Sequence, residues 1–81
     1  HKVEPRYTQP AIRGGIQGAV ILDLIIDTEG HVESVQVLRG LPLGLTTSAV
    51  NAVKRWEFAA SIYNGKPVSV RYILTVHFNL R

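Results

Sequence analysis

Residues 18–39 read GAVILDLIIDTEGHVESVQVLR, and this stretch decides the fold. Apolar side chains alternate from Val20 to Ile26, and the positions between them are largely apolar too, which is typical of a strand with neighbours on both sides. Asp27 to Gly30 has the composition of a tight turn, in which the glycine can adopt a positive φ. Alternation then resumes from Val32 to Arg39. The stretch therefore predicts a β-hairpin.

An amphipathic helix is predicted after this hairpin. Residues 40–44 read GLPLG and end the second strand, and Thr46 follows as a candidate N-cap. Apolar side chains then recur at helical spacing, at Ala49, Ala52, Val53 and Trp56. We expect this stripe to pack on the sheet, with Trp56 as the central aromatic residue of the core.

The last strand is predicted from the strict alternation of Val68 to Leu80, which follows a turn at residues 64–67. A strand of about 13 residues is ~40 Å long, longer than its partner, so we expect part of it to lack a pairing neighbour. Because the first strand is apolar on both faces, we place it in the centre of the sheet. The expected order is 2-1-3, with the last strand at an edge.

The N-terminal residues predict an extended arm. Pro5 and Pro10 each remove a backbone donor and favour an extended conformation before them, so residues 1–9 are expected to be a loosely held, mobile arm. A short helix from Pro10 to Arg13 follows it. The expected fold is α+β: a three-stranded antiparallel sheet in the order 2-1-3, with one amphipathic helix on one face and a short N-terminal helix and arm.

Composition limits the function further. The chain has 81 residues, 46% of them apolar, and a net charge of +3, which fits a single domain at residues 1–81. Its basic residues are dispersed rather than gathered in a stripe, which disfavours nucleic-acid binding. The longest apolar run, Ala19 to Leu22, is too short to cross a bilayer. We expect the chain to be a domain excised from a longer protein, without its anchor and linker.

The sequence contains no recognisable catalytic or metal-binding pattern. His1, His31 and His77 have no second ligand at metal-binding spacing, and Asp27 and Glu29 belong to a turn that explains them. No serine has the glycine frame of a nucleophile elbow, and cysteine is absent. We therefore expect no enzyme activity, no cofactor and no metal.

A set of short motifs runs through nearly the whole chain in a fixed order. The positions are Pro5 to Tyr7, Ala11, Gly15 to Val20, Asp27 to Val32, Leu45, Ala49, Val53 to Phe58, Gly65 to Val68 and Val76 to Phe78. Together they resemble the C-terminal domain of TonB-family energy transducers, which typically reads P-x-Y-P, an alanine and G-I-x-G-x-V, then D-x-x-G-x-V in a hairpin turn and W-R-F at the end of the helix. Thr8, Glu57 and Ala60 depart from the proline, arginine and proline of that family.

The resemblance implies a mechanical coupling role with no active site. Transducers of this family couple an inner-membrane helix to an ExbB–ExbD proton motor and cross the periplasm with a proline-rich linker. Their C-terminal domain binds the N-terminal TonB box of outer-membrane transporters, which adds as a strand beside the last strand of the sheet. The implied function is to transmit proton-motive work for substrate uptake, such as iron–siderophore uptake. The implied location is the periplasmic domain of an inner-membrane-anchored bacterial protein.

The resemblance also implies two groups of partner-binding residues. On the last strand these are Arg71, Ile73, Thr75, His77 and Asn79. On the arm, where the family has a glutamine-containing Q-box, they are Val3, Glu4, Pro5, Arg6 and Tyr7. Arg71 and Arg81 are expected to attract acidic segments of the partner.

Other functions stay open at this point. The same fold can serve as a TonB-like or TolA-like interaction domain of a sensor, secretion or envelope-integrity protein. A nucleic-acid-binding α+β module is the less favoured alternative. The exposed edge strand also favours pairing between two copies, and hence a homodimer.

Overall fold

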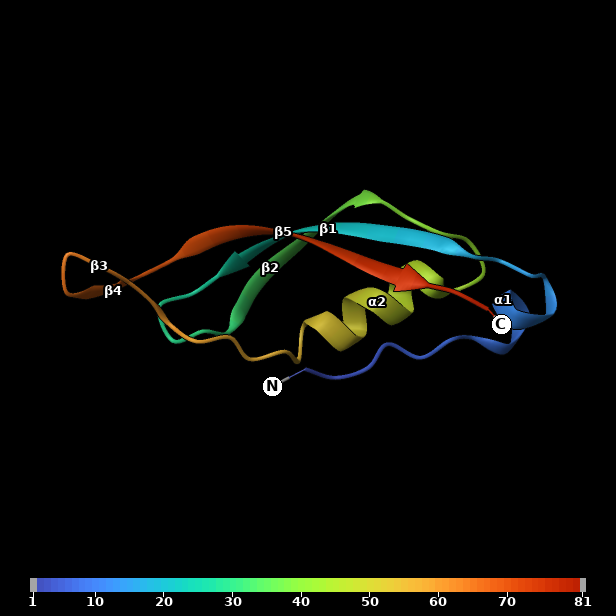
Figure 1. Cartoon of the computed structure of the whole chain (residues 1–81), viewed down its shortest axis with the longest axis horizontal. Helices are drawn as coiled ribbons and strands as arrows, with labels where there is room; N and C mark the ends of the chain where they lie inside the picture. The colour runs from blue at the N-terminus through green and yellow to red at the C-terminus, as the bar shows by residue number, and fades with distance from the viewer. Residues whose placement is uncertain (1, 81) are drawn as a thin grey trace.

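The computed structural model describes residues 2–80, so His1 and Arg81 lie outside the described residues. Its centre is a three-stranded antiparallel sheet in the order β2-β1-β5. The strands are β1 (Gly18–Ile26), β2 (Val32–Arg39) and β5 (Val70–Phe78), and helix α2 (Leu45–Val53) covers one face of the sheet (Figure 1). The predicted α+β fold, with the first strand in the centre and the last at an edge, is confirmed.

The core lies between α2 and one face of the sheet. On β1, Val20, Leu22 and Leu24 are fully buried. The other buried apolar side chains are Ile26 on β1, Leu45, Ala49, Ala52 and Val53 on α2, Val76 and Phe78 on β5, and Ala11 and Trp56 outside the sheet and α2. Burial of each Val or Leu side chain stabilises the fold by about 1.5–3 kcal/mol. The alternation of β1 therefore supplies the central layer of the core.

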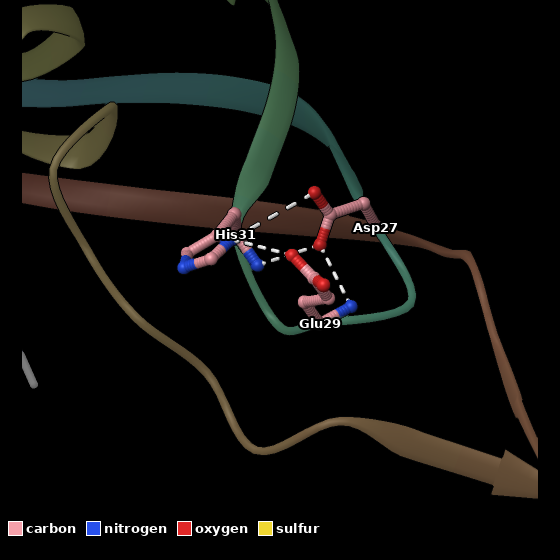
Figure 2. Close-up of side chains that lie close together, drawn as sticks. All are labelled: Asp27, Glu29 and His31. Atoms are coloured by element: carbon pink, nitrogen blue, oxygen red, sulfur yellow. Dashed lines mark hydrogen bonds and ion pairs between the residues drawn. The ribbon is translucent and has the colours of Figure 1, made fainter.

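The turn between β1 and β2 forms as predicted and also holds a distant segment. The Asp27 Oδ1 atom accepts hydrogen bonds of 2.9 Å from the backbone N–H groups of Glu29 and His31 (Figure 2). Gly30 has a φ of +89°, and a Cβ atom there would lie 2.0 Å from the carbonyl oxygen of Phe58. The Phe58 N–H donates to the Gly30 carbonyl at 2.8 Å. Only glycine therefore fits this close approach of two backbones.

Helix α2 forms in the predicted region, but it ends before the predicted Trp56, and its predicted cap is wrong. The N-cap is Gly44, and Thr46 lies within the first turn. The Thr46 hydroxyl instead accepts from the Leu41 N–H at 2.8 Å and donates to the Leu41 carbonyl at 2.9 Å. The loop before the helix folds back over its first turn, and the two hydrogen bonds of the Thr46 hydroxyl hold the loop in this position. The helix ends at Val53, so Trp56 reaches the core from the following turn.

The single last strand predicted for residues 68–80 is also wrong. Strand β4 (Lys66–Val68) pairs with β3 (Ser61–Tyr63) in a separate hairpin, which projects at one end of the molecule (Figure 1). Asn64 and Gly65 form its two-residue turn, with φ of +51° and +76°. Ser69 separates β4 from β5, and its hydroxyl donates to the Ile26 carbonyl at 3.1 Å.

This division also corrects the expected unpaired extension. All nine residues of β5 pair with β1, from Gly18 opposite Phe78 to Ile26 opposite Val70. Residues 66–68 do not pair with β1. They form β4 and pair with β3 instead. The free part of β5 is therefore its outer edge, and not an overhanging end.

The short N-terminal helix α1 (Gln9–Arg13) begins one residue before the predicted Pro10. Thr8 is its N-cap, and the Thr8 hydroxyl accepts from the Ala11 N–H at 3.3 Å. The departure from the family's proline at this position thus supplies a helix cap. Neither described helix, of five and nine residues, is long and apolar enough to span a membrane.

Candidate partner-binding site

The outer edge of β5 is a row of backbone groups without a strand beside it in residues 2–80. In the sheet, β5 pairs only with β1, and the pairing continues through nine consecutive residue pairs without a register shift. In an antiparallel strand, the N–H and C=O groups of successive residues point alternately to one neighbour and to the other. Every second residue of β5 therefore presents a donor and an acceptor at the free edge.

The predicted site residues on β5 lie on the face turned away from α2. Ile73, Thr75 and His77 are exposed and lie opposite Asp23, Ile21 and Ala19 of β1. Val76 and Phe78, at the alternate positions, are buried in the core. Asn79 follows the end of the strand and is exposed.

Arg71 is engaged with Asp23. The Arg71 Nε atom donates to Asp23 Oδ1 at 2.9 Å, and Arg71 Nη2 donates to Asp23 Oδ2 at 2.7 Å, which makes a bidentate ion pair across β1 and β5. These hydrogen bonds lower the pKa of Asp23 against the opposing effect of desolvation. The same pair raises the pKa of Arg71. The Arg71 guanidinium therefore stabilises the sheet through Asp23, whereas the sequence indicated a role in attracting acidic partners. Arg81 lies outside the described residues.

The N-terminal arm is extended, as predicted, but the expectation that it is loosely held is wrong. The Trp56 Nε1 atom donates to the Val3 carbonyl at 2.8 Å, the Ser48 hydroxyl donates to the Arg6 carbonyl, and the Tyr7 hydroxyl donates to the Ile16 carbonyl. The Tyr7 ring also packs edge-on against Phe78, with 5.3 Å between the ring centroids. Side chains of the body thus fix the backbone of the arm.

The arm and the C-terminal half of β5 form the two walls of one cavity of about 360 Å³. Seven of the sequence-predicted residues line it: Val3, Glu4, Pro5, Tyr7, Thr75, His77 and Asn79. Arg6, Arg71 and Ile73 do not line it. Lys2 and Trp56 also line the cavity, and the sequence did not indicate them. The Lys2 ammonium lies 5.3 Å from the centroid of the Trp56 ring, so the two form a cation–π pair at its edge.

The turn between β1 and β2 gathers three groups of the types that bind metals. Asp27, Glu29 and His31 present potential ligand atoms within 4.8 Å of one another (Figure 2). The His31 Nδ1 atom lies 3.6 Å from Glu29 Oε1 and 3.9 Å from Asp27 Oδ2. The pKa of Asp27 is lowered, first by the hydrogen bond from the His31 backbone N–H. The hydrogen bonds from the Glu29 and His31 backbone to Asp27 bring the three side chains together. The cluster is therefore explained by the hairpin turn, and it is not by itself an indication of a metal site.

Comparison with known proteins gives the same family throughout. Residues 3–80 match the family model of the Gram-negative bacterial TonB protein C-terminal. Over 80 residues the chain is 34% identical to Protein TonB of Vibrio cholerae, and the aligned region covers 98% of this chain and 33% of that protein. Over 77 residues it is 36% identical to Protein TonB of Xanthomonas campestris pv. campestris, which covers 94% and 34%.

The chain spans about a third of the length of the curated relatives it matches. The family match, by contrast, covers every described strand and helix, from the arm to the end of β5. The chain belongs to the TonB C-terminal domain family.

Proposed function

We propose that this chain is the periplasmic partner-binding domain of a TonB-like energy transducer. In this proposal it binds the N-terminal TonB box of outer-membrane transporters by strand addition to β5. The observation that carries the proposal is the regular free edge of β5 beside the cavity formed with the arm. Strand addition needs such an edge, and the adjoining cavity can accept side chains of the added strand.

The two outer edges of the sheet differ in a way that favours β5. The pairing of β2 with β1 has register shifts between Ile21 and Leu22 and between Ile25 and Ile26. Such bulges bend and twist a strand, and edge strands of natural proteins use them to prevent further pairing. The pairing of β5 with β1 has no shift. An incoming strand would therefore find an uninterrupted hydrogen-bonding edge at β5.

Strand addition suits a domain that transmits force. Each backbone hydrogen bond contributes a net ~0.5–1.5 kcal/mol, and several in a row bind many sequences with modest selectivity. A pull along the strand direction loads these bonds together. Specificity would then come from the residues that line the cavity, including Thr75 and His77.

The rest of the proposal concerns the parent protein. In it, residues 1–81 form a single TonB-like domain whose residues 1–9 are the Q-box-like arm, without catalytic chemistry of its own. An inner-membrane anchor and a proline-rich linker would connect it to an ExbB–ExbD-type motor, and the transported substrates would include iron–siderophore complexes. Two copies of the isolated domain can also pair through the same edge, so a homodimer would compete with the transporter.

The test is a titration of the ¹⁵N-labelled chain with a synthetic peptide of a transporter's N-terminal TonB box. We expect amide shifts along residues 70–78 and at residues 3–7, with residues 32–39 unchanged. The matched controls are two peptides N-methylated at alternate residues, in the two opposite registers. One register should abolish binding, since it removes the donors that face β5, and the other should keep it. Equal binding by both methylated peptides would exclude strand addition.

A further inference from the structure

A second cavity lies between the N-terminal arm and α2. Its volume is about 560 Å³, within the ~300–1,000 Å³ typical of ligand sites. The arm supplies Val3, Arg6 and Thr8 to its walls, and α2 with its following turn supplies Asn51 and Arg55. Val3, Glu4 and Arg6 are among the partner-binding residues that the resemblance implies, but the proposed function, strand addition to β5, assigns no ligand to this cavity.

The walls of this cavity are held in place by bonds between distant parts of the chain. The Ser48 hydroxyl of α2 donates to the Arg6 carbonyl. The Thr8 hydroxyl donates to the Leu43 carbonyl, in the loop before α2, at 2.7 Å. Two such ties, at the middle and at the end of the arm, keep the cavity open before a ligand arrives. A preformed site loses less entropy on binding than one that must close around its ligand.

This cavity is distinct from the one beside β5. In an extended segment, successive side chains point to opposite sides. Arg6 and Thr8 accordingly line the cavity against α2, and Pro5 and Tyr7 line the cavity against β5. Residues 5–8 thus separate the two cavities, whereas Val3 and Glu4 line both, and a ligand held by Arg6 and Arg55 need not occupy the cavity beside β5.

The charges of the lining favour an anionic ligand. Arg6 and Arg55 are exposed, and neither forms an ion pair within residues 2–80. Among the described residues of the lining, Glu4 is the only carboxylate, and it too forms no ion pair there, so positive charge is in excess. An arginine guanidinium is well suited to carboxylates because its planar N–H groups can bind both oxygens.

The uncharged part of the lining favours a peptide. The side chains of Thr47 and Asn51 form no hydrogen bond within the described residues and can pair with peptide groups of a ligand. Val3 and Leu43 offer apolar surface, and Leu43 is 48% exposed. Two arginines are too few for the row of phosphate contacts that nucleic acids need. We propose that this cavity binds an acidic peptide segment of a protein partner, with its carboxylates on Arg6 and Arg55.

The test is distinguishable from that of the proposed function, because residues 44–55 report on this cavity and residues 70–78 report on the β5 edge, whereas shifts in the arm are common to both. The probe is an N-acetylated, C-amidated peptide of alternating glutamate and leucine, and its control has glutamine in place of glutamate. Titration of the ¹⁵N-labelled chain should move the amide signals of residues 44–55 and 3–8, and leave residues 70–78 in place. Binding should weaken as salt is added, and the glutamine peptide should not bind.

Charge variants decide whether the cavity itself is responsible. Arg6→Gln and Arg55→Gln should each weaken binding by about three- to fivefold. Arg39→Gln removes the same charge from β2, outside the cavity, and should have no effect. Equal weakening by all three variants would show attraction by net charge only and overturn the proposal. Shifts concentrated on residues 70–78 would assign the peptide to the β5 edge, and tighter binding of a short oligothymidylate at residues 44–55 would assign the cavity to phosphates.

Discussion

The indole Nε1 atom of Trp56 donates a 2.8 Å hydrogen bond to the backbone carbonyl of Val3, 53 residues earlier in the chain. Trp56 is 9% exposed, and the centroid of its ring lies 6.1 Å from that of the Phe58 ring. One side chain therefore fills the end of the core below α2 and also fixes the arm that lines both cavities.

We expect Trp56→Ala to destabilise the fold by about 3–5 kcal/mol, through the lost burial and the cavity left behind. That is a large fraction of the stability of a domain of this size. Trp56→Phe is the matched variant, since it keeps an aromatic ring but removes the donor to Val3. It should cost about 1 kcal/mol beyond any repacking and speed amide exchange in residues 3–7. Chemical denaturation and hydrogen exchange measure the two effects. A Trp56→Ala variant that melts within a few degrees of the wild type would contradict this packing.

Gly30→Ala should be one of the most harmful small substitutions. The new Cβ would meet the Phe58 carbonyl oxygen at 2.0 Å, and φ is +89°. We expect a loss of about 2–3 kcal/mol. Gly65→Ala is the control, because its φ of +76° is equally unfavourable but open space surrounds it. It should cost only about 1 kcal/mol. Equal losses in urea unfolding would mean that the contact with Phe58 is unimportant.

The pH dependence of stability should include a contribution from Asp23. Its pKa is lowered in the folded state by Arg71, so the carboxylate stabilises the fold above its unfolded pKa of about 3.9. This stabilisation is lost as the pH falls through the folded pKa. Arg71→Gln should raise the pKa of Asp23 and reduce the loss of stability in that acid range. Carboxyl ¹³C shifts followed against pH measure this directly.

Asp27 is the internal control for that titration. Its pKa is also lowered, but by the backbone N–H groups of His31 and Glu29, and not by Arg71. It should stay low in Arg71→Gln. A parallel rise of both pKa values would indicate a general change of fold instead of the loss of one ion pair.

The elements that the sequence predicted are those with a long periodic pattern. Residues 18–39 alternate over two strands around a turn of strong composition, and the apolar character of both faces of β1 indicated its central place. The order of the sheet followed from that single inference. Local pattern and tertiary packing agree here, which is why the prediction succeeded.

The wrong predictions concern short segments and contacts between distant residues. β3 has three residues, too few to show alternation, so its partner β4 was predicted as part of the last strand. Thr46 has the side-chain oxygen of a helix cap, but the loop before α2 folds back, and the Thr46 hydroxyl forms its hydrogen bonds with the Leu41 backbone instead. The hydrogen bonds that hold the arm join residues separated by 42 positions in one case and by 53 in the other. Contacts between such distant residues produce no periodic pattern in the sequence.

The candidate site was predicted only in part for the same reason. The alternation of the last strand separates Thr75 and His77 from the buried Val76 and Phe78, so the exposed row could be read from the sequence. The sequence could not show that the arm and β5 face each other across one cavity, because the position of the arm depends on the hydrogen bond from the Trp56 indole to Val3.

The main chain of β5 should matter more for partner binding than its exposed side chains. Thr75 pairs with Ile21 in the middle of the shared register, and its side chain is exposed. Thr75→Pro removes one N–H from the strand, whereas Thr75→Ser keeps it. If that N–H faces the free edge, we expect Thr75→Pro to abolish binding of a TonB-box peptide with the fold intact, and Thr75→Ser to bind almost as the wild type does. If it faces β1, Thr75→Pro should unfold the chain, and Tyr72→Pro, at the opposite alternation, becomes the edge variant. Circular dichroism checks folding and the amide titration measures binding. A folded proline variant in each alternation, both with wild-type affinity, would exclude strand addition at β5.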